Sequence, residues 1–193
     1  VTPPAWIENL WIETADGRYM AEFSLLDFGD TIKQIHPHFV FGCNFSIRKS
    51  VVNKIGGFHP DALPQSLLKF RGDGETHVSD QVLSLGYKTI YNPNASVQHF
   101  VPASRMNIDY LKKRSYAEGI TRSYRDIRKM GFVDERLFTT LKHETKKLLN
   151  LMRENKIGRA VCRSFYNGYY FHQQEVKRDE ALLAWVMKEN YLD

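Results

Sequence analysis

The stretch from Gly72 to His99 holds the residues best suited to chemistry. Asp73 and Glu75 lie among glycines directly before an amphipathic segment, and His99 follows a short β-branched and aromatic run. Carboxylates and imidazoles are the side chains that proteins use for proton transfer and for metal binding. The pattern predicts a loop, helix, turn, strand, loop and strand, in that order. This order can bring an acid at the helix start and His99 at the strand end to one rim of a sheet.

A second candidate group interrupts an apolar run. Residues 39–41 predict a buried strand, residues 45–47 resume it with a period of two, and Gly42, Cys43 and Asn44 stand between them. A glycine inside a strand pattern indicates that another group approaches the backbone closely. That group is either a packing neighbour at a bulge or a ligand lying against Gly42, to which Asn44 can donate a hydrogen bond.

Apolar spacing predicts several helices around these strands. The longest is expected over residues 108–128 and ends at Gly131, with Gly119 marking a break or a close contact. A turn is expected at residues 156–158. The other expected helices are residues 1–12, 48–55 (ending at Gly56-Gly57), 134–154, 159–176 and 179–190, the last with Asp179 as N-cap. The chain therefore divides into an α/β domain, residues 1–130, and a helical appendage, residues 131–193.

Composition indicates a packed, mildly basic protein. The chain has 193 residues, of which 42% are hydrophobic, and a net charge of +5 with a pI of about 9.1. The excess of Lys and Arg is explained by a solvated surface, by an anionic ligand such as a nucleotide-sugar diphosphate, or by an anionic membrane surface. The length and core-forming residues exclude a disordered chain.

Cysteine usage and hydropathy favour a cytoplasmic location. Cys43 and Cys162 lie far apart without metal-ligand spacing, which fits a reducing compartment. No apolar run reaches the roughly 18 residues that a membrane span requires, and no signal peptide opens the chain. We expect a cytoplasmic protein with peripheral contact at the inner face of the membrane. The basic, aromatic helices after residue 108 either make that contact or pack against the body of the protein.

An ordered set of short motifs resembles the C-terminal half of a family 2 glycosyltransferase, which has the GT-A fold. The resemblance covers residues 38–125 and depends on the order and spacing of the motifs more than on any single one. The motifs are Phe41-Gly42-Cys43-Asn44-Phe45-Ser46-Ile47-Arg48, Ile55-Gly56-Gly57-Phe58, Gly72–Glu75, Leu85-Gly86-Tyr87, Tyr91-Asn92-Pro93 and His99. The fold class expected from it is α/β, with a partial GT-A-like mixed sheet followed by the helical appendage.

The resemblance implies inverting transfer of a sugar from a nucleotide-diphosphate donor, such as a UDP-sugar, to the hydroxyl of a glycan or lipid-linked acceptor. Glu75 corresponds to the catalytic base and Asp73 is the second choice, because Gly74 stands where the family carries its first acid. His99 corresponds to a ligand of a divalent metal, Mn²⁺ or Mg²⁺. Gly42, Cys43 and Asn44 correspond to the floor beneath the donor sugar.

Cations after His99 are candidates for binding the donor diphosphate. Arg105, Lys113 and Arg114 could reach it from a mobile segment, or they form a solvated helix face. The other candidate residues can also have purely structural roles. Asp73 and Glu75 can be helix N-terminal acids that the dipole favours, and His99 a hydrogen-bonded histidine at a strand end.

The family's nucleotide-binding half and its aspartate metal motif are not recognisable before Phe39. We therefore expect a fragment of a longer enzyme, or a chain that a partner completes, with little activity alone. The alternative function is a non-catalytic GT-A-derived binding or scaffold module. A basic nucleic-acid binder is a third interpretation, and no recognised motif supports it.

Overall fold

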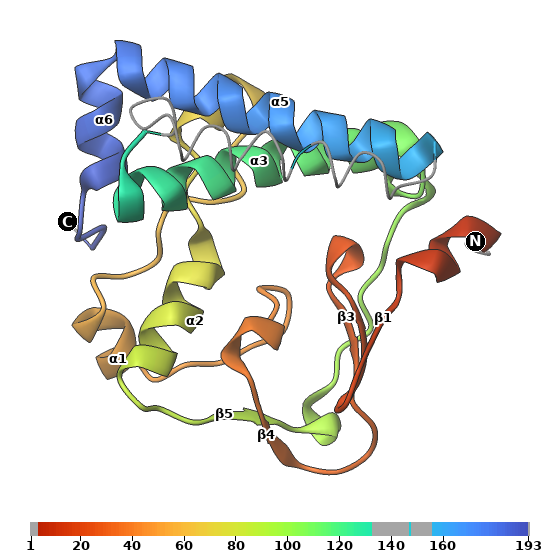
Figure 1. Cartoon of the computed structure of the whole chain (residues 1–193). Helices are drawn as coiled ribbons and strands as arrows, with labels where there is room; N and C mark the ends of the chain where they lie inside the picture. Colours follow the sequence, from red (N-terminus) through yellow and green to blue (C-terminus); the bar gives the residue numbers. More distant parts are fainter. Residues whose placement is uncertain (1–3, 133–146, 148–155, 193) are drawn as a thin grey trace. The chain divides into compact units, whose positions relative to one another are not determined.

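The computed structural model describes residues 4–132, 147 and 156–192 (Figure 1). The chain divides into two compact units that alternate along the sequence. Unit 1 contains Val1–His59, Gly74–Met106 and Asn190–Asp193, and unit 2 contains Pro60–Asp73 and Asn107–Glu189. The mixed α/β class is confirmed. The sequence analysis set a single boundary at residue 130, whereas in these units the long helix before that residue already belongs with the C-terminal helices.

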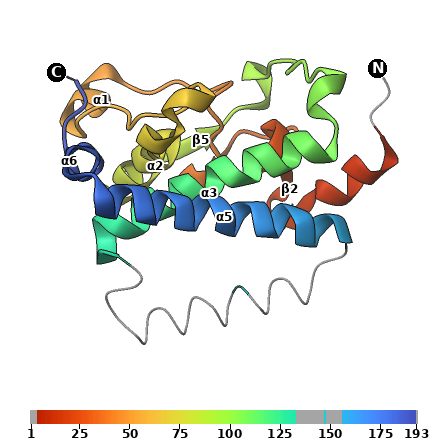
Figure 2. The same cartoon turned by 90° about the horizontal axis from the view of Figure 1, so that it is seen from above.

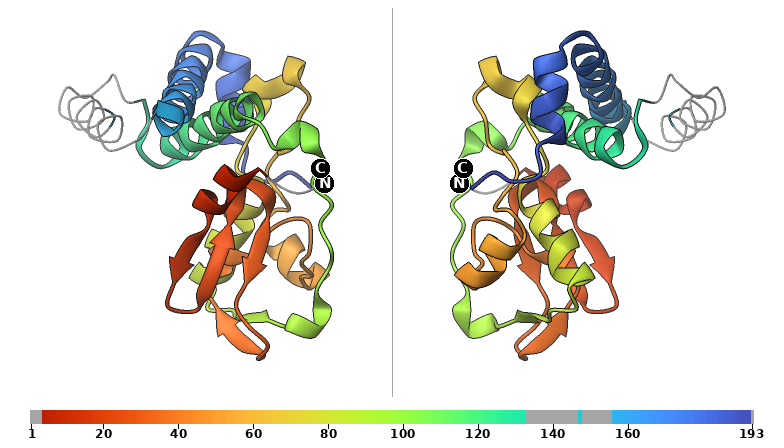
Figure 3. Two further views of the ribbon diagram at one scale, coloured as in Figure 1. Left: turned by 90° about the vertical axis from the view of Figure 1, so that its right-hand side faces the viewer. Right: turned by 90° about the vertical axis from the view of Figure 1, so that its left-hand side faces the viewer.

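A three-stranded antiparallel sheet opens unit 1, and its strands stand side by side in Figure 3. It follows the 3₁₀ helix η1 (Ala5–Leu10), so the helix expected within residues 1–12 is present in 3₁₀ form. The glycine of the Asp16-Gly17 turn has a φ of +140°, and a Cβ there would overlap the carbonyl of Asp27. The strands are β1 (Ile12–Thr14), β2 (Gly17–Met20) and β3 (Leu25–Asp27), with the 3₁₀ turn η2 (Ala21–Phe23) between the last two.

A second sheet consists of β4 (Lys33–Ile35) and β5 (Thr89–Tyr91), which pair antiparallel. The strand predicted for residues 39–41 is wrong, because the chain turns after β4 into the 3₁₀ helix η3 (Pro37–Phe39). The His36 ring accepts a hydrogen bond from the backbone N–H of His38, which stabilises this turn. The strand predicted for residues 45–47 is also wrong, because these residues are coil.

Two short helices of unit 1 agree with the sequence. Helix α1 (Lys49–Lys54) ends as expected at Gly56 and Gly57, whose φ values are +78° and +88°. The Gly57 N–H donates to the Val52 carbonyl and the Gly56 N–H to the Asn53 carbonyl, which is the Schellman pattern. Helix α2 (Gly74–Ser84) begins at the predicted position and is followed by a turn at Gly86, where φ is +73°.

The described residues after β5 form no strand, and residues 96–102 are coil, so the strand predicted to end at His99 is wrong. The Asn92 side chain accepts from the Asn94 N–H and starts the 3₁₀ turn η5 (Pro93–Ala95). The 3₁₀ turn η6 (Ala103–Arg105) follows this coil. His99 therefore lies in an irregular segment.

Unit 2 is helical. It contains the 3₁₀ helix η4 (Gln65–Phe70) and the helices α3 (Ile108–Met130), α5 (Lys156–Arg178) and α6 (Glu180–Met187). As predicted, Gly131 ends α3 and Asp179 caps α6, accepting from the Leu182 N–H at 3.0 Å. The turn predicted for residues 156–158 is wrong, because these residues are the first turn of α5. The helix predicted over residues 134–154 lies outside the described residues, apart from residue 147.

Helices α3 and α5 run alongside each other over most of their lengths (Figure 2). Two glycines make this close approach possible. A Cβ at Gly119 would overlap the carbonyl oxygen of Phe165, and one at Gly168 would overlap that of Tyr116. Gly119 therefore marks a close contact and not a break. The apolar core beside the crossing consists of Tyr124, Ile127, Val176, Leu182 and Val186.

Polar side chains are buried in the same helix pair. The Ser123 hydroxyl and Nδ1 of His172 share a hydrogen bond of 2.8 Å, and both residues are fully buried. Burial lowers the pKa of His172 from its ordinary 6.5 to about 4, although a backbone hydrogen bond with Lys69 opposes the shift. The Tyr169 hydroxyl donates to Asp126 at 3.1 Å, and burial together with this carboxylate raises the pKa of Tyr169. Burial therefore favours the neutral imidazole of His172 and the protonated hydroxyl of Tyr169.

Candidate functional site

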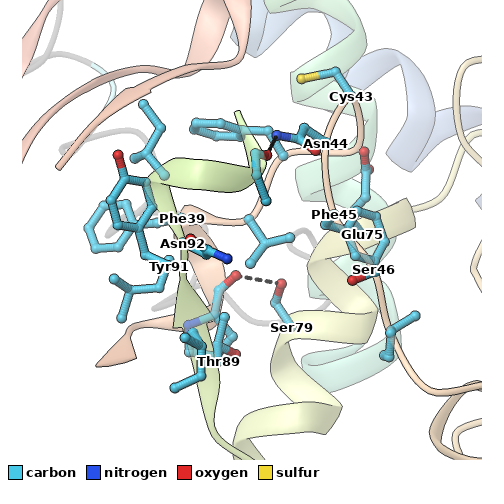
Figure 4. A pocket seen from close by; sticks show the side chains of 18 of the residues that line it. Phe39, Cys43, Asn44, Phe45, Ser46, Glu75, Ser79, Thr89, Tyr91 and Asn92 are labelled. Carbon is cyan, nitrogen blue, oxygen red and sulfur yellow. Dashed lines mark hydrogen bonds between the residues drawn. The ribbon is translucent and has the colours of Figure 1, made fainter. Parts of the chain in front are cut away.

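Unit 1 contains a cavity of about 900 Å³ whose walls come from the coil between η3 and α1, one face of α2, and the segment from β5 to His99. Figure 4 shows Cys43, Asn44, Phe45, Ser46 and Glu75 on one side of this cavity and Thr89, Tyr91 and Asn92 on the other. A cavity of this volume is large enough for a small ligand such as a sugar with attached groups.

Glu75 lies in the first turn of α2 and lines the cavity. The partial positive charge of a helix N-terminus favours a carboxylate anion at this position. The Glu75 carboxylate lies against the backbone of Gly42. A side chain at position 42 would block this place, because its Cβ would overlap Oε1 of Glu75 and would lie 2.9 Å from Cδ. The close neighbour predicted for Gly42 is therefore this acidic side chain of the protein itself.

His99 lines the same cavity, so the structure brings Glu75 and His99 to one site as the sequence predicted. Nδ1 of His99 lies 2.7 Å from the carbonyl oxygen of Phe23. A carbonyl oxygen can only accept, so Nδ1 carries the proton in this bond and the lone pair of the neutral ring is on Nε2. This is the arrangement in which a histidine acts as a ligand or base through Nε2.

The predicted floor is held by hydrogen bonds between distant segments. Cys43 and Asn44 both line the cavity. The Asn44 amide nitrogen donates to the Ala95 carbonyl at 2.8 Å, and the Cys43 thiol lies 3.8 Å from the carbonyl of Ser24. Together with the bond from His99 to Phe23, these contacts join the turn at residues 23–24, the coil at residues 43–44 and the segment from Ala95 to His99.

Asp73, Arg105, Lys113 and Arg114 do not line this cavity. Asp73 belongs to unit 2, where it is 7% exposed and its carboxylate lies 3.6 Å from Nε of Arg125 in α3. Arg114 also belongs to unit 2 and lies 3.9 Å from Glu118 on its own helix. Arg105, in η6 of unit 1, is exposed. Of the two candidate acids, the cavity therefore contains only Glu75.

Several polar residues that line the cavity were not assigned from the sequence, among them Ser79 and Asn92. Ser79 is 5% exposed, and its hydroxyl donates to the Pro37 carbonyl at 2.9 Å, as Figure 4 shows. It lies one helical turn after Glu75, so the i,i+4 spacing was a usable signal. Asn92 was noted only within the Tyr91-Asn92-Pro93 motif, and its side chain starts η5 at the cavity wall.

The residues present were compared with the needs of a divalent metal. Within the part of the chain that the structure describes, no three His, Cys, Asp or Glu side chains are grouped so that they could hold a metal ion. His99 can supply one ligand through Nε2, but Asp73 does not accompany it. The described residues therefore do not form a metal site on their own.

The chain was also compared with known proteins. No protein-family model, no characterised protein and no solved structure gave a significant match. Among the described residues, no helix has both the length and the apolar composition required to cross a bilayer. The residues of the cavity and the sequence motifs around them are therefore the basis for a function.

Proposed function

We propose that this chain is the acceptor and metal half of an inverting glycosyltransferase that moves a sugar from a UDP-sugar to a glycan or lipid-linked acceptor, with the GT-A fold as its architecture. The single observation that carries the proposal is the shared cavity, which Glu75, Asn44 and His99 line together. These are the residues that the resemblance assigns to the base, the sugar floor and the metal ligand.

In this proposal Glu75 is the general base. Its carboxylate accepts the proton of the acceptor hydroxyl while the acceptor oxygen attacks the anomeric carbon of the donor. The bond between that carbon and the diphosphate oxygen breaks, and the nucleoside diphosphate leaves with the electron pair. Attack from the face opposite the leaving group inverts the anomeric centre. Asn44 and the floor around Gly42 hold the sugar at attack distance.

A divalent cation, when bound, would offset the charge of the departing diphosphate. His99 is the one ligand that we assign to it, and no step above is routed through the metal. We further propose that the nucleotide-binding half lies on additional polypeptide, and that the enzyme works in the cytoplasm at the inner face of the membrane.

Turnover of UDP-sugars by the natural polypeptide that carries this chain tests the proposal. We expect Glu75→Gln to lower kcat by about 10²- to 10⁴-fold with little change in KM, because only proton transfer is lost. Glu13→Gln, in strand β1 of the same unit, is the matched control and should be fully active. A fully active Glu75→Gln variant would contradict the assignment of the base.

The same assay distinguishes Asp73 from Glu75 as the catalytic base. Because Asp73 is buried beside Arg125, we expect Asp73→Asn to lower the melting temperature while kcat of the folded fraction changes little. A loss of kcat with unchanged stability would transfer the role of base from Glu75 to Asp73.

The alternative is a non-catalytic binding module. It is favoured by one observation, that the described residues supply a single acid and a single histidine to the cavity. Calorimetry with UDP and Mn²⁺ distinguishes the two functions when it is combined with the turnover assay. Binding without turnover of any UDP-sugar supports the module, and the absence of both would reject glycosyl transfer and the module alike.

A further inference from the structure

The two faces of α5 differ sharply in charge. The helix contains five lysines and arginines and a single acid, Glu175. One face is buried and includes Tyr169 and His172, which are fully buried and hydrogen bonded to α3. Glu175 is half-buried. Burial raises the pKa of Tyr116 on α3 and the charge of Glu175 adds to this shift, so the acid lies near the neighbouring helix.

The exposed face of α5 contains cations and apolar side chains but no acid. We call these residues the α5 face, and they are Ile157, Arg159, Arg163, Asn167, Phe171, Gln174, Lys177 and Arg178. The side chains of Ile157 and Phe171 are each 37% exposed. An α-helix turns 100° per residue, so these positions fall on one side of the helix.

The rest of unit 2 has the same sign of charge. Lys and Arg outnumber Asp and Glu in this unit, whereas the acids outnumber the bases in unit 1. An anionic partner is therefore drawn to unit 2 by its overall charge as well as by the α5 face.

We propose that the α5 face docks on the surface of a bilayer that contains anionic lipids. Charge complementarity carries the proposal, because four cations without an acid on one helix face match a layer of anionic headgroups. Helices that lie in the membrane interface combine Lys and Arg with bulky apolar side chains that enter the headgroup region. Phe171 and Ile157 supply such side chains. A nucleic-acid partner would fit less well, because the aliphatic side chain of Ile157 cannot stack on a base as an aromatic ring does.

Binding to sedimented vesicles tests this proposal without any enzyme assay, so its outcome is separate from that of glycosyl transfer. The chain should bind vesicles that contain phosphatidylglycerol, bind much less to pure phosphatidylcholine vesicles, and be released by high salt. Failure to bind the anionic vesicles, or equal binding to both kinds, would overturn the proposal.

A matched pair of double variants locates the surface. Arg159→Gln with Arg163→Gln should weaken binding to anionic vesicles by roughly 25-fold, since each cation near such a surface contributes about fivefold. Lys49→Gln with Lys54→Gln removes the same charge from exposed positions of α1 and should change binding little. Equal losses of vesicle binding in the two double variants would mean that binding depends on the net charge of the chain and not on the α5 face.

The apolar part of the surface is tested by Phe171→Ala, which should weaken binding roughly threefold. Met187→Ala removes an exposed apolar side chain from α6 and serves as its control. Circular dichroism checks that each variant folds. Binding of single-stranded DNA with the same dependence on Arg159 and Arg163, in a chain that ignores anionic vesicles, would replace the lipid surface by a nucleic acid.

Discussion

Each unit of this protein is stabilised internally by a different kind of interaction. Unit 1 consists of strands of three or four residues, short helices and coil, and side-chain hydrogen bonds such as that from Asn44 to Ala95 fasten its segments. Unit 2 consists mainly of two 23-residue helices that cross at glycines, with polar pairs buried between them. Unit 1 contains the cavity, and unit 2 has the tightly packed interior.

Exposed apolar residues occur in both units, and the two most exposed large ones among the described residues, Phe100 and Ile32, belong to unit 1. In unit 1, Ile90 of β5 is 55% exposed, Val97 is 56% exposed and Phe100 is 81% exposed. In unit 2, Met130 and Met187 are 56% and 47% exposed, whereas Tyr169 beside Gly119 is fully buried. The comparison teaches that the candidate chemistry belongs to the unit with less regular backbone, where side chains at the ends of elements remain accessible.

The largest effect that this comparison predicts is at the helix crossing. Gly119→Ala should lower the free energy of unfolding by about 3 kcal/mol, because its Cβ meets the backbone carbonyl of Phe165, which cannot move independently. This cost outweighs the gain of about 1 kcal/mol that alanine brings to a helix interior. Thermal unfolding followed by circular dichroism measures it, and an unchanged melting temperature would mean that the helices do not pack this closely.

Acid should destabilise unit 2 by a comparable amount. The folded state keeps His172 neutral down to about pH 4, whereas an unfolded histidine binds a proton near pH 6.5. Protons therefore favour unfolding below pH 6.5. The contribution of His172 is complete above that pH and is lost as the pH falls toward 4, about 3 kcal/mol in all.

Amide hydrogen exchange of α3 and α5 between pH 7 and pH 4 measures this loss. His172→Gln should remove most of the pH dependence, whatever its stability at neutral pH, because the titrating group is gone. His38→Gln replaces an exposed histidine of unit 1 and should leave the slope of unit 2 unchanged. A wild-type slope that persists in His172→Gln would assign the titration to another group.

A smaller loss is expected at the start of α3. The Asn107 side chain accepts from the Tyr110 N–H at 2.8 Å, so Asn107→Ala should cost about 1 kcal/mol through loss of this cap. Asn167→Ala is the same substitution at an exposed position inside α5 and should be neutral or slightly stabilising. Equal unfolding free energies for the two variants would contradict the capping role.

The smallest effect on stability should be at Gly42 in unit 1. Its neighbour is the end of the Glu75 side chain, which can rotate away, so Gly42→Ala should cost less than about 0.5 kcal/mol. The same substitution is thus nearly harmless here and damaging at Gly119. If the proposed transfer reaction is present, its rate should fall because the carboxylate is displaced. A large loss of stability in Gly42→Ala would show that Glu75 is fixed in place.

Much of the helical structure could be predicted from the sequence. Apolar spacing located α3 and most of α5, and local signals located Gly131 after α3 and Asp179 before α6. These predictions succeeded because caps and helical periodicity depend on residues a few positions apart. The start of α5 was missed, because residues 156–158 were predicted to be a turn. The strands predicted at residues 39–41, 45–47 and before His99 failed, because pairing requires a partner strand that a local apolar run does not specify.

The candidate site was predictable in part for the same reason. Residue type and local position identified Glu75 and His99, and the i,i+4 position of Ser79 could have been added. Asp73 differs from Glu75 by two positions in the sequence, yet it lies buried beside Arg125, some fifty residues away along the chain. Sequence spacing could not separate the two acids.

The sequence by itself determined the helices, their caps and the chemical character of the candidate residues, since these follow from neighbours along the chain. Only the tertiary structure decided that Glu75, Asn44 and His99 line one cavity while Asp73 does not. It also decided that Gly42 faces Glu75 and that Gly119 faces Phe165. The physical reason is that burial and close approach are set by segments distant in sequence, and no local pattern records which of those segments will meet.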